Sequence, residues 1–183
     1  MTSPYRPEFE AALRIFARVS GAMKARGFAP PVLVGGAAVE LYSASAVVTG
    51  DFDVVTGRQD AFEEELCKVG FVRPGGAGKA TRGWIHPDLG LGFEVVSDSL
   101  LDGMADRDRL RFFSLDADGE AAVLSLEDMI ADRVGQYASG SAPAMLGQAR
   151  TLFDLFPDAD LEYLERRIRH ESGGDHGLEI LNA

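Results

Sequence analysis

Two stretches of sequence decide the fold, Val32-Leu33-Val34-Gly35-Gly36 and Asp51-Phe52-Asp53-Val54-Val55. The first predicts a short buried strand that leads directly into a glycine pair, after which a helical pattern resumes from Ala37 to Tyr42. The second predicts another strand, in which successive side chains point to opposite faces. Asp51 and Asp53 therefore share one face of this strand, while Phe52 and Val54 point into the core.

Two neighbouring carboxylates on a strand repel each other, and burying them without a partner is costly. A divalent cation that prefers oxygen ligands removes the conflict, and Mg²⁺ (or Mn²⁺) suits a site where phosphates supply further ligands. In the segment 91–96, Glu94 interrupts an otherwise apolar predicted strand. If this strand lies beside 51–55, Glu94 completes a three-carboxylate cluster that can hold two cations ~4 Å apart. Asp88 and Asp98 are the alternatives for the third ligand.

The glycine pair lies at the junction of a predicted strand and a predicted helix. Gly35 and Gly36 have no Cβ, so the backbone can approach a phosphate closely at the positive end of the helix dipole. Residues 66–87 add a local positive charge, because they contain four basic residues and no acid. This segment is either a solvated loop or a glycine-rich flap that closes on a triphosphate, with Lys79 and Arg82 contacting the phosphates.

The order and spacing of these elements resemble the nucleotidyltransferase superfamily of the DNA-polymerase-β type. Its signature is a hydrophobic residue, Gly, and Gly or Ser, then an acid-hydrophobic-acid strand and a third acid on a later strand. Residues 32–55 look most like the small bacterial members, including the abortive-infection toxin type. The resemblance implies that Asp51 and Asp53 bind both metals, that Glu94 binds the catalytic metal and helps to activate the acceptor, and that Gly35 and Gly36 contact the triphosphate.

The resemblance also implies a reaction. A nucleoside monophosphate would move from an NTP to a hydroxyl acceptor, with release of pyrophosphate. A protein side chain, a tRNA end, an aminoglycoside and a small metabolite all remain open as acceptors.

The sequence departs from this pattern at several positions. Gly36 stands where Ser is commoner, Val47 stands where small bacterial members often carry Arg, and Arg133 is the nearest equivalent of a helical Lys. These departures motivate an alternative from another class, a non-catalytic nucleotide-sensing or protein-binding member such as the antitoxin half of a toxin–antitoxin pair. The intact carboxylates favour the enzyme. A metal-dependent phosphohydrolase is a third hypothesis.

Composition sets further limits. The chain has 183 residues and a net charge of −11, which disfavours binding of long duplex nucleic acid. Its single cysteine excludes an internal disulfide and a cysteine-based zinc site. No apolar run approaches the ~20 residues that span a bilayer, and the N-terminus lacks the layout of a signal peptide. These observations predict a cytoplasmic protein without a membrane partner.

The predicted class is α+β, a nucleotidyltransferase-like mixed sheet with flanking helices and a small helical part after it. Residues 1–125 are expected to form the α/β core and residues 126–183 a helical subdomain packed on it. The core begins with an amphipathic helix over 8–26 and ends with a hairpin over 111–124. The segment 126–171 predicts about three helices, which form the acceptor side of the cleft or a homodimer face. The tail from Gly173 is expected to fray.

Overall fold

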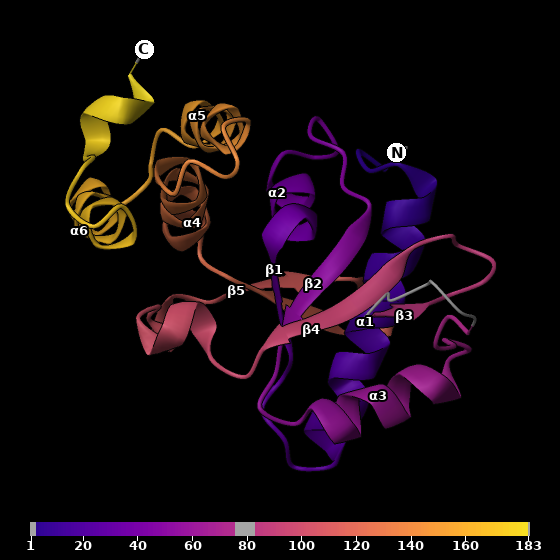
Figure 1. Cartoon of the computed structure of the whole chain (residues 1–183). Coiled ribbons are helices and arrows are strands. Elements are labelled where there is room, and N and C mark those ends of the chain that lie inside the picture. Colours follow the sequence, from indigo (N-terminus) through magenta and orange to yellow (C-terminus); the bar gives the residue numbers. More distant parts are fainter. Residues whose placement is uncertain (1–2, 76–82, 183) are drawn as a thin grey trace. The chain divides into compact units, whose positions relative to one another are not determined.

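The computed structural model describes residues 3–75 and 83–182 (Figure 1). Its helices are α1 Pro7–Ala25, α2 Gly35–Tyr42, α3 Gln59–Lys68, α4 Leu126–Ala138, α5 Met145–Leu155 and α6 Leu161–Glu171. Its strands are β1 Val32–Val34, β2 Asp51–Val55, β3 Trp84–Ile85, β4 Gly92–Ser97, β5 Arg111–Ser114 and β6 Glu120–Val123. The chain divides into two compact units, Met1–Ala38 with Val48–Leu124, and Val39–Val47 with Ser125–Ala183.

The first unit contains a mixed sheet in the order β3-β4-β2-β1-β6-β5. β1 pairs with β2 in antiparallel fashion and with β6 in parallel fashion. β2 also pairs with β4 in parallel fashion, whereas β3–β4 and β5–β6 are antiparallel. The predicted mixed sheet with flanking helices is confirmed, and β5–β6 is the expected hairpin.

Aromatic packing fixes α1 against one face of the sheet. The rings of Phe9 and Phe52 lie 5.1 Å apart, and those of Phe16 and Phe93 lie 6.1 Å apart, measured between centroids. The Phe52 and Phe93 rings are 4.8 Å apart across β2 and β4, and all four side chains are fully buried or nearly so. Since side chains alternate along a strand, the residues flanking Phe52 and Phe93 point to the other face.

One local prediction is wrong. α2 begins at Gly35 rather than after the glycine pair, so both glycines belong to the first turn of the helix. The segment 71–73 contributes a single bridge, between Val72 and Ile85. A short stretch of β-branched and aromatic residues indicates extended backbone but not how much of it pairs.

The second unit consists of α4, α5 and α6 with two further segments. Residues 39–47 belong to this unit, whereas the expected division at 125/126 assigned them to the core. Within this unit, the Tyr42 and Phe156 ring centroids lie 5.8 Å apart. The tail is not frayed, contrary to the prediction. Leu178–Leu181 forms a 3₁₀ turn, Leu181 is buried, and the Arg150 guanidinium donates two hydrogen bonds to the Ile180 carbonyl.

Within the part of the chain that the structure describes, no helix has the length and apolar character needed to cross a membrane.

A buried ion pair stabilises the helical unit. The Asp128 carboxylate is fully buried, accepts a hydrogen bond from Arg167 Nε at 2.7 Å, and also contacts the Tyr163 and Ser125 hydroxyls. Removing one partner of such a pair leaves the other charge buried without compensation.

We therefore expect Asp128→Asn to lower the free energy of unfolding by about 3–5 kcal/mol, measured by urea denaturation. The matched control is Asp154→Asn, because Asp154 is exposed on α5 and its replacement should change stability by less than about 0.5 kcal/mol. Equal effects of the two substitutions would contradict the assigned role of the pair.

Candidate functional site

The three predicted carboxylates lie on two neighbouring strands. Asp51 and Asp53 are on β2 and Glu94 is on β4, and the parallel register pairs Asp51 with Gly92 and Asp53 with Glu94. Paired strands lie ~4.8 Å apart, so Asp53 and Glu94 are direct neighbours and Asp51 is two residues along the same face. This face is opposite the one that Phe52 and Phe93 bury against α1. The condition set by the sequence, that strand 91–96 lies beside 51–55, is met.

The alternative third acids are placed differently. Val55 pairs with Ser97, so Asp98 follows the end of the strand pair that is farthest from Asp51. Asp88 lies in the turn between β3 and β4. Glu94 is the acid that pairs in register with Asp53.

Gly35 and Asp53 fit together closely. The antiparallel register of β1 and β2 sets Val34 opposite Asp53, which brings Gly35 against the Asp53 side chain. A Cβ at Gly35 would lie 2.0 Å from Asp53 Oδ2, a contact that no real Cβ makes. Gly35 also has a φ of +62°, which glycine adopts without strain. The carboxylate therefore occupies space that any other residue at position 35 would fill.

Glycines also lie beside the other two acids. Asp51 Oδ1 accepts a hydrogen bond from the Gly92 N–H at 3.0 Å, and a Cβ at Gly92 would lie 2.9 Å from the same oxygen. A Cβ at Gly83 would lie 3.4 Å from Glu94 Cβ. Asp51 is exposed, whereas Asp53 and Glu94 are half-buried. A glycine therefore lies next to each of the three acids.

The second glycine of the pair faces a threonine. A Cβ at Gly36 would lie 2.4 Å from Thr49 Oγ1, so the threonine hydroxyl stands beside the first turn of α2. Thr49 Oγ1 also donates to the Asp51 carbonyl at 3.2 Å. The Arg6 guanidinium donates to the Thr49 carbonyl at 2.6 Å, which ties the start of α1 to the segment just before β2.

The sequence alone singles out neither Arg6 nor Thr49. A lone Arg near the N-terminus and a Thr before a strand carry no pattern of their own. Thr49 is identified only in the three-dimensional structure. Gly36 has no positive φ that would require glycine, and the Thr49 hydroxyl occupies the space next to it where a Cβ would be.

The described residues contain no preformed metal site. No three His, Cys, Asp or Glu side chains among them are grouped so that they could hold a metal ion. The donor set itself consists of carboxylate oxygens, which is the chemistry that Mg²⁺ and Mn²⁺ prefer. The backbone register brings the three acids to adjacent positions, but their side chains do not converge, and one oxygen of Asp51 is engaged by the Gly92 amide.

The predicted phosphate contacts of the glycine-rich segment are not visible. Lys79 and Arg82 lie outside the described residues. Arg73, at the start of this segment, pairs with Glu63 and lies 5.0 Å from the centre of the Trp84 ring. The Arg73 guanidinium therefore contacts one residue of α3, Glu63, and one residue of β3, Trp84.

Arg133 belongs to the helical unit and is buried on α4. Its Nη1 donates to Gln136 at 3.1 Å, whereas its Nε and Nη2 have no hydrogen-bond partner among the described residues. Arg133 Nε lies 3.8 Å from Asp132 Oδ2, so the buried charge has an ion-pair partner although Nε and Nη2 lack hydrogen bonds.

We expect Gly35→Ala to lower the free energy of unfolding by about 2–4 kcal/mol, because the new methyl group displaces the Asp53 carboxylate and the positive φ becomes strained. Gly50→Ala is the matched control, since a Cβ there meets nothing within 4 Å and its φ is not positive. Urea denaturation of both variants measures the difference. A cost at Gly50 equal to that at Gly35 would refute the assigned fit.

A double-mutant cycle tests the contact between Gly36 and Thr49. Gly36→Ala should be destabilising in the wild-type background, and less so in a Thr49→Ala background, because the second change removes the hydroxyl that the new Cβ would meet. We expect a coupling free energy of about 0.5–3 kcal/mol from urea denaturation of the four proteins. Strictly additive effects would show that the two positions do not share this space.

Comparison with known proteins places the fold. No protein-family model and no curated protein matches the sequence. The structure matches the crystal structure of an antigenic nucleotidyltransferase-like protein from Paracoccidioides brasiliensis, with a TM-score of 0.62 and 16% identity over 98% of this chain and 94% of that one. It also matches the solution structure of the antibiotic-resistance factor ANT(2'')-Ia, with a TM-score of 0.56 and 16% identity over 87% of this chain and 90% of that one. The chain therefore has the nucleotidyltransferase-like fold that the sequence predicted.

Proposed function

We propose that the protein is a metal-dependent nucleotidyltransferase, which moves a nucleoside monophosphate from an NTP to a hydroxyl acceptor and releases pyrophosphate. The observation that carries the proposal is the placement of Asp51, Asp53 and Glu94 at adjacent register positions on one face of β2 and β4. The nucleotidyltransferase-like fold supports it, as does the glycine pair that opens α2 beside Asp53.

The electrostatics of the three acids support a bound cation. Within the described part of the chain, neither Asp51 nor Glu94 forms an ion pair with Lys, Arg or His. Carboxylates this close together repel one another, and a divalent cation is the partner that neutralises them and also binds phosphate oxygens. Mg²⁺ or Mn²⁺ would be held by Asp51, Asp53 and Glu94 after their side chains rotate towards one another, with the strand register unchanged.

Each residue then has a definite task. A bound cation stabilises the negative charge that develops on the transferred phosphoryl group and its leaving group. Glu94, which is half-buried on β4, would bind the catalytic metal and accept the proton of the acceptor hydroxyl. Gly35 and Gly36 bring the first turn of α2 close to the Asp53 carboxylate and the Thr49 hydroxyl, and the backbone amides of this turn would bind the phosphates.

The acceptor is a separate part of the proposal. One structural neighbour is an antibiotic-resistance factor, so a hydroxyl-bearing antibiotic is one acceptor to test. The net charge of −11 suits a cationic acceptor such as an aminoglycoside. A protein side chain, a tRNA end and a small metabolite are the other acceptors in the same assay.

The binding step is tested by thermal unfolding with Mg²⁺ or Mn²⁺ and each NTP in turn. A ligand present at about 100 times its dissociation constant stabilises the folded state by about 2.7 kcal/mol, which should raise the melting temperature by roughly 5–10 °C. Asp53→Asn should abolish the metal-dependent part of the shift. Asp98→Asn is the matched control, because Asp98 lies at the other end of the strand pair, and its shift should equal that of the wild type.

Two results would contradict the proposal. One is the absence of a shift with every NTP and both metals. The other is a shift that Asp53→Asn leaves unchanged, since this would place the nucleotide away from the acids.

A second candidate function is nucleotide sensing without catalysis, as in an antitoxin-like member. It is favoured by the absence of a preformed metal-binding group among the described residues. Incubation with α-³²P-labelled NTPs, Mg²⁺ and either purified acceptors or cell extract separates the two functions. Label transfer that is lost in Asp51→Asn identifies the enzyme, whereas a melting shift without any transfer identifies the sensor.

A further inference from the structure

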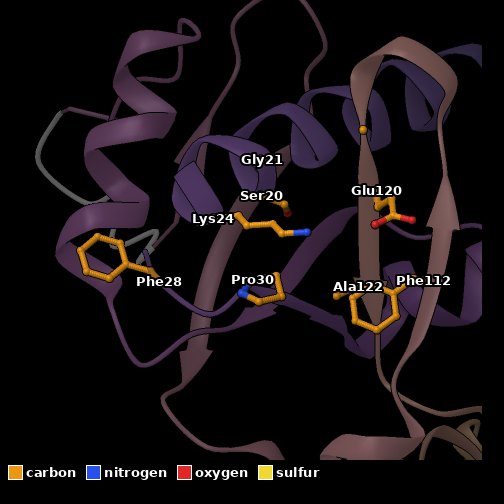
Figure 2. A pocket seen from close by; sticks show the side chains of 9 residues that line it. Ser20, Gly21, Lys24, Phe28, Pro30, Phe112, Glu120 and Ala122 are labelled. Carbon is orange, nitrogen blue, oxygen red and sulfur yellow. The ribbon is translucent and has the colours of Figure 1, made fainter. Parts of the chain in front are cut away.

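A pocket of about 480 Å³ lies between the C-terminal half of α1 and the β5–β6 hairpin (Figure 2). Its volume is that of an ordinary small-molecule site. Pro30, Phe112 and Ala122 supply apolar walls. Since α1 packs on the sheet face opposite the three carboxylates, this pocket is separate from the proposed nucleotide site.

The pocket contains an unsatisfied buried hydroxyl. Ser20 lines the pocket from α1, is only 3% exposed, and its Oγ has no hydrogen-bond partner among the described residues. Nearly all buried polar groups in folded proteins are hydrogen-bonded, so an exception calls for a partner. A serine hydroxyl both donates and accepts, and rotation about χ1 lets it reach a polar atom inside the pocket.

The next residue keeps the pocket open. Gly21 also lines it, within α1, and a Cβ built there meets nothing within 4 Å. Glycine in a helix interior is less stable than alanine, and neither a close contact nor a positive φ requires it here. The position beside Gly21 is therefore open, and a Cβ there would make no close contact.

Two opposite charges face each other across the pocket. Lys24 lies one helical turn after Ser20, and Glu120 begins β6; Figure 2 shows their charged groups reaching in from opposite walls. Within the described residues neither side chain forms an ion pair. The pocket therefore offers the Lys24 ammonium group, the Glu120 carboxylate and apolar walls. A small molecule that carries both charges on a flat apolar body would complement all three.

We propose that this pocket binds a small zwitterionic aromatic molecule, the chemical class of the aromatic α-amino acids. The ring packs against Phe112 and Pro30, with the edge-to-face or offset geometry that aromatic pairs prefer. The carboxylate pairs with Lys24 and the ammonium group with Glu120. Ser20 Oγ gains the hydrogen-bond partner that it lacks.

The test uses the full chain and isothermal titration calorimetry at low salt with three probes. L-tryptophan carries both charges, indole-3-acetate only the negative one and tryptamine only the positive one. Tryptophan should bind with one-to-one stoichiometry and roughly tenfold more tightly than either analogue, because each analogue leaves one pocket charge unpaired. Lys24→Gln and Glu120→Gln should each weaken tryptophan binding by about the same factor.

A variant with a larger side chain at position 21 tests whether the probes bind in this pocket. Gly21→Leu should abolish binding while the melting temperature stays the same or rises, because leucine is a better helix former and its Cβ meets nothing within 4 Å. Gly147→Leu is the matched variant, since Gly147 lies in α5 with nothing within 4 Å of its Cβ position, and it should leave binding intact.

Three outcomes would overturn the proposal: no saturable binding of any probe up to 10 mM, equal affinity for all three probes, or undiminished binding by Gly21→Leu. The result is independent of the proposed enzymatic activity, because Asp53→Asn should bind tryptophan as the wild type does.

Discussion

The close fit of the Asp53 carboxylate into the empty side-chain position of Gly35 is the constraint on which the candidate site depends. The pairing of Val34 with Asp53 forces the next residue against that carboxylate, and the chain turns into α2 there with a positive φ. Both demands exclude a side chain at position 35. The glycine thus has a structural role before any phosphate binds, because it lets an acid from β2 lie against the first turn of the following helix.

The sheet divides apolar packing and chemistry between its two faces. On one face, Phe52 and Phe93 join Phe9 and Phe16 of α1 in a single aromatic cluster. On the other face, the residues that flank these two rings are Asp51 and Asp53 on β2 and Gly92 and Glu94 on β4. The register of β2 and β4 is therefore fixed by burial of the aromatic rings, since a slip by one residue would bury the carboxylates and expose the rings. Packing on one side holds the geometry on the other.

The sequence was informative where a local pattern carries the information. The strand 51–55, the glycine pair and the hairpin 111–124 follow from alternation and turn residues, and all are present. The packing of residues 39–47 with Phe156 and the ordered turn at Leu178–Leu181 were not foreseen, because each depends on contacts between distant segments. The Arg6–Thr49 bond, which joins residues 43 apart, was missed for the same reason.

The departure at Gly36 takes on a different meaning once Thr49 is placed. A serine at position 36 would bring a hydroxyl to the first turn of α2, and its absence was one reason to consider a non-catalytic protein. Thr49 Oγ1 stands 2.4 Å from where the Cβ of residue 36 would be, so a hydroxyl is present at that turn, supplied from the opposite segment. A side chain at position 36 would force the Thr49 hydroxyl to move. Glycine at position 36 therefore suits the observed position of the Thr49 hydroxyl, and it does not by itself indicate a lost phosphate site.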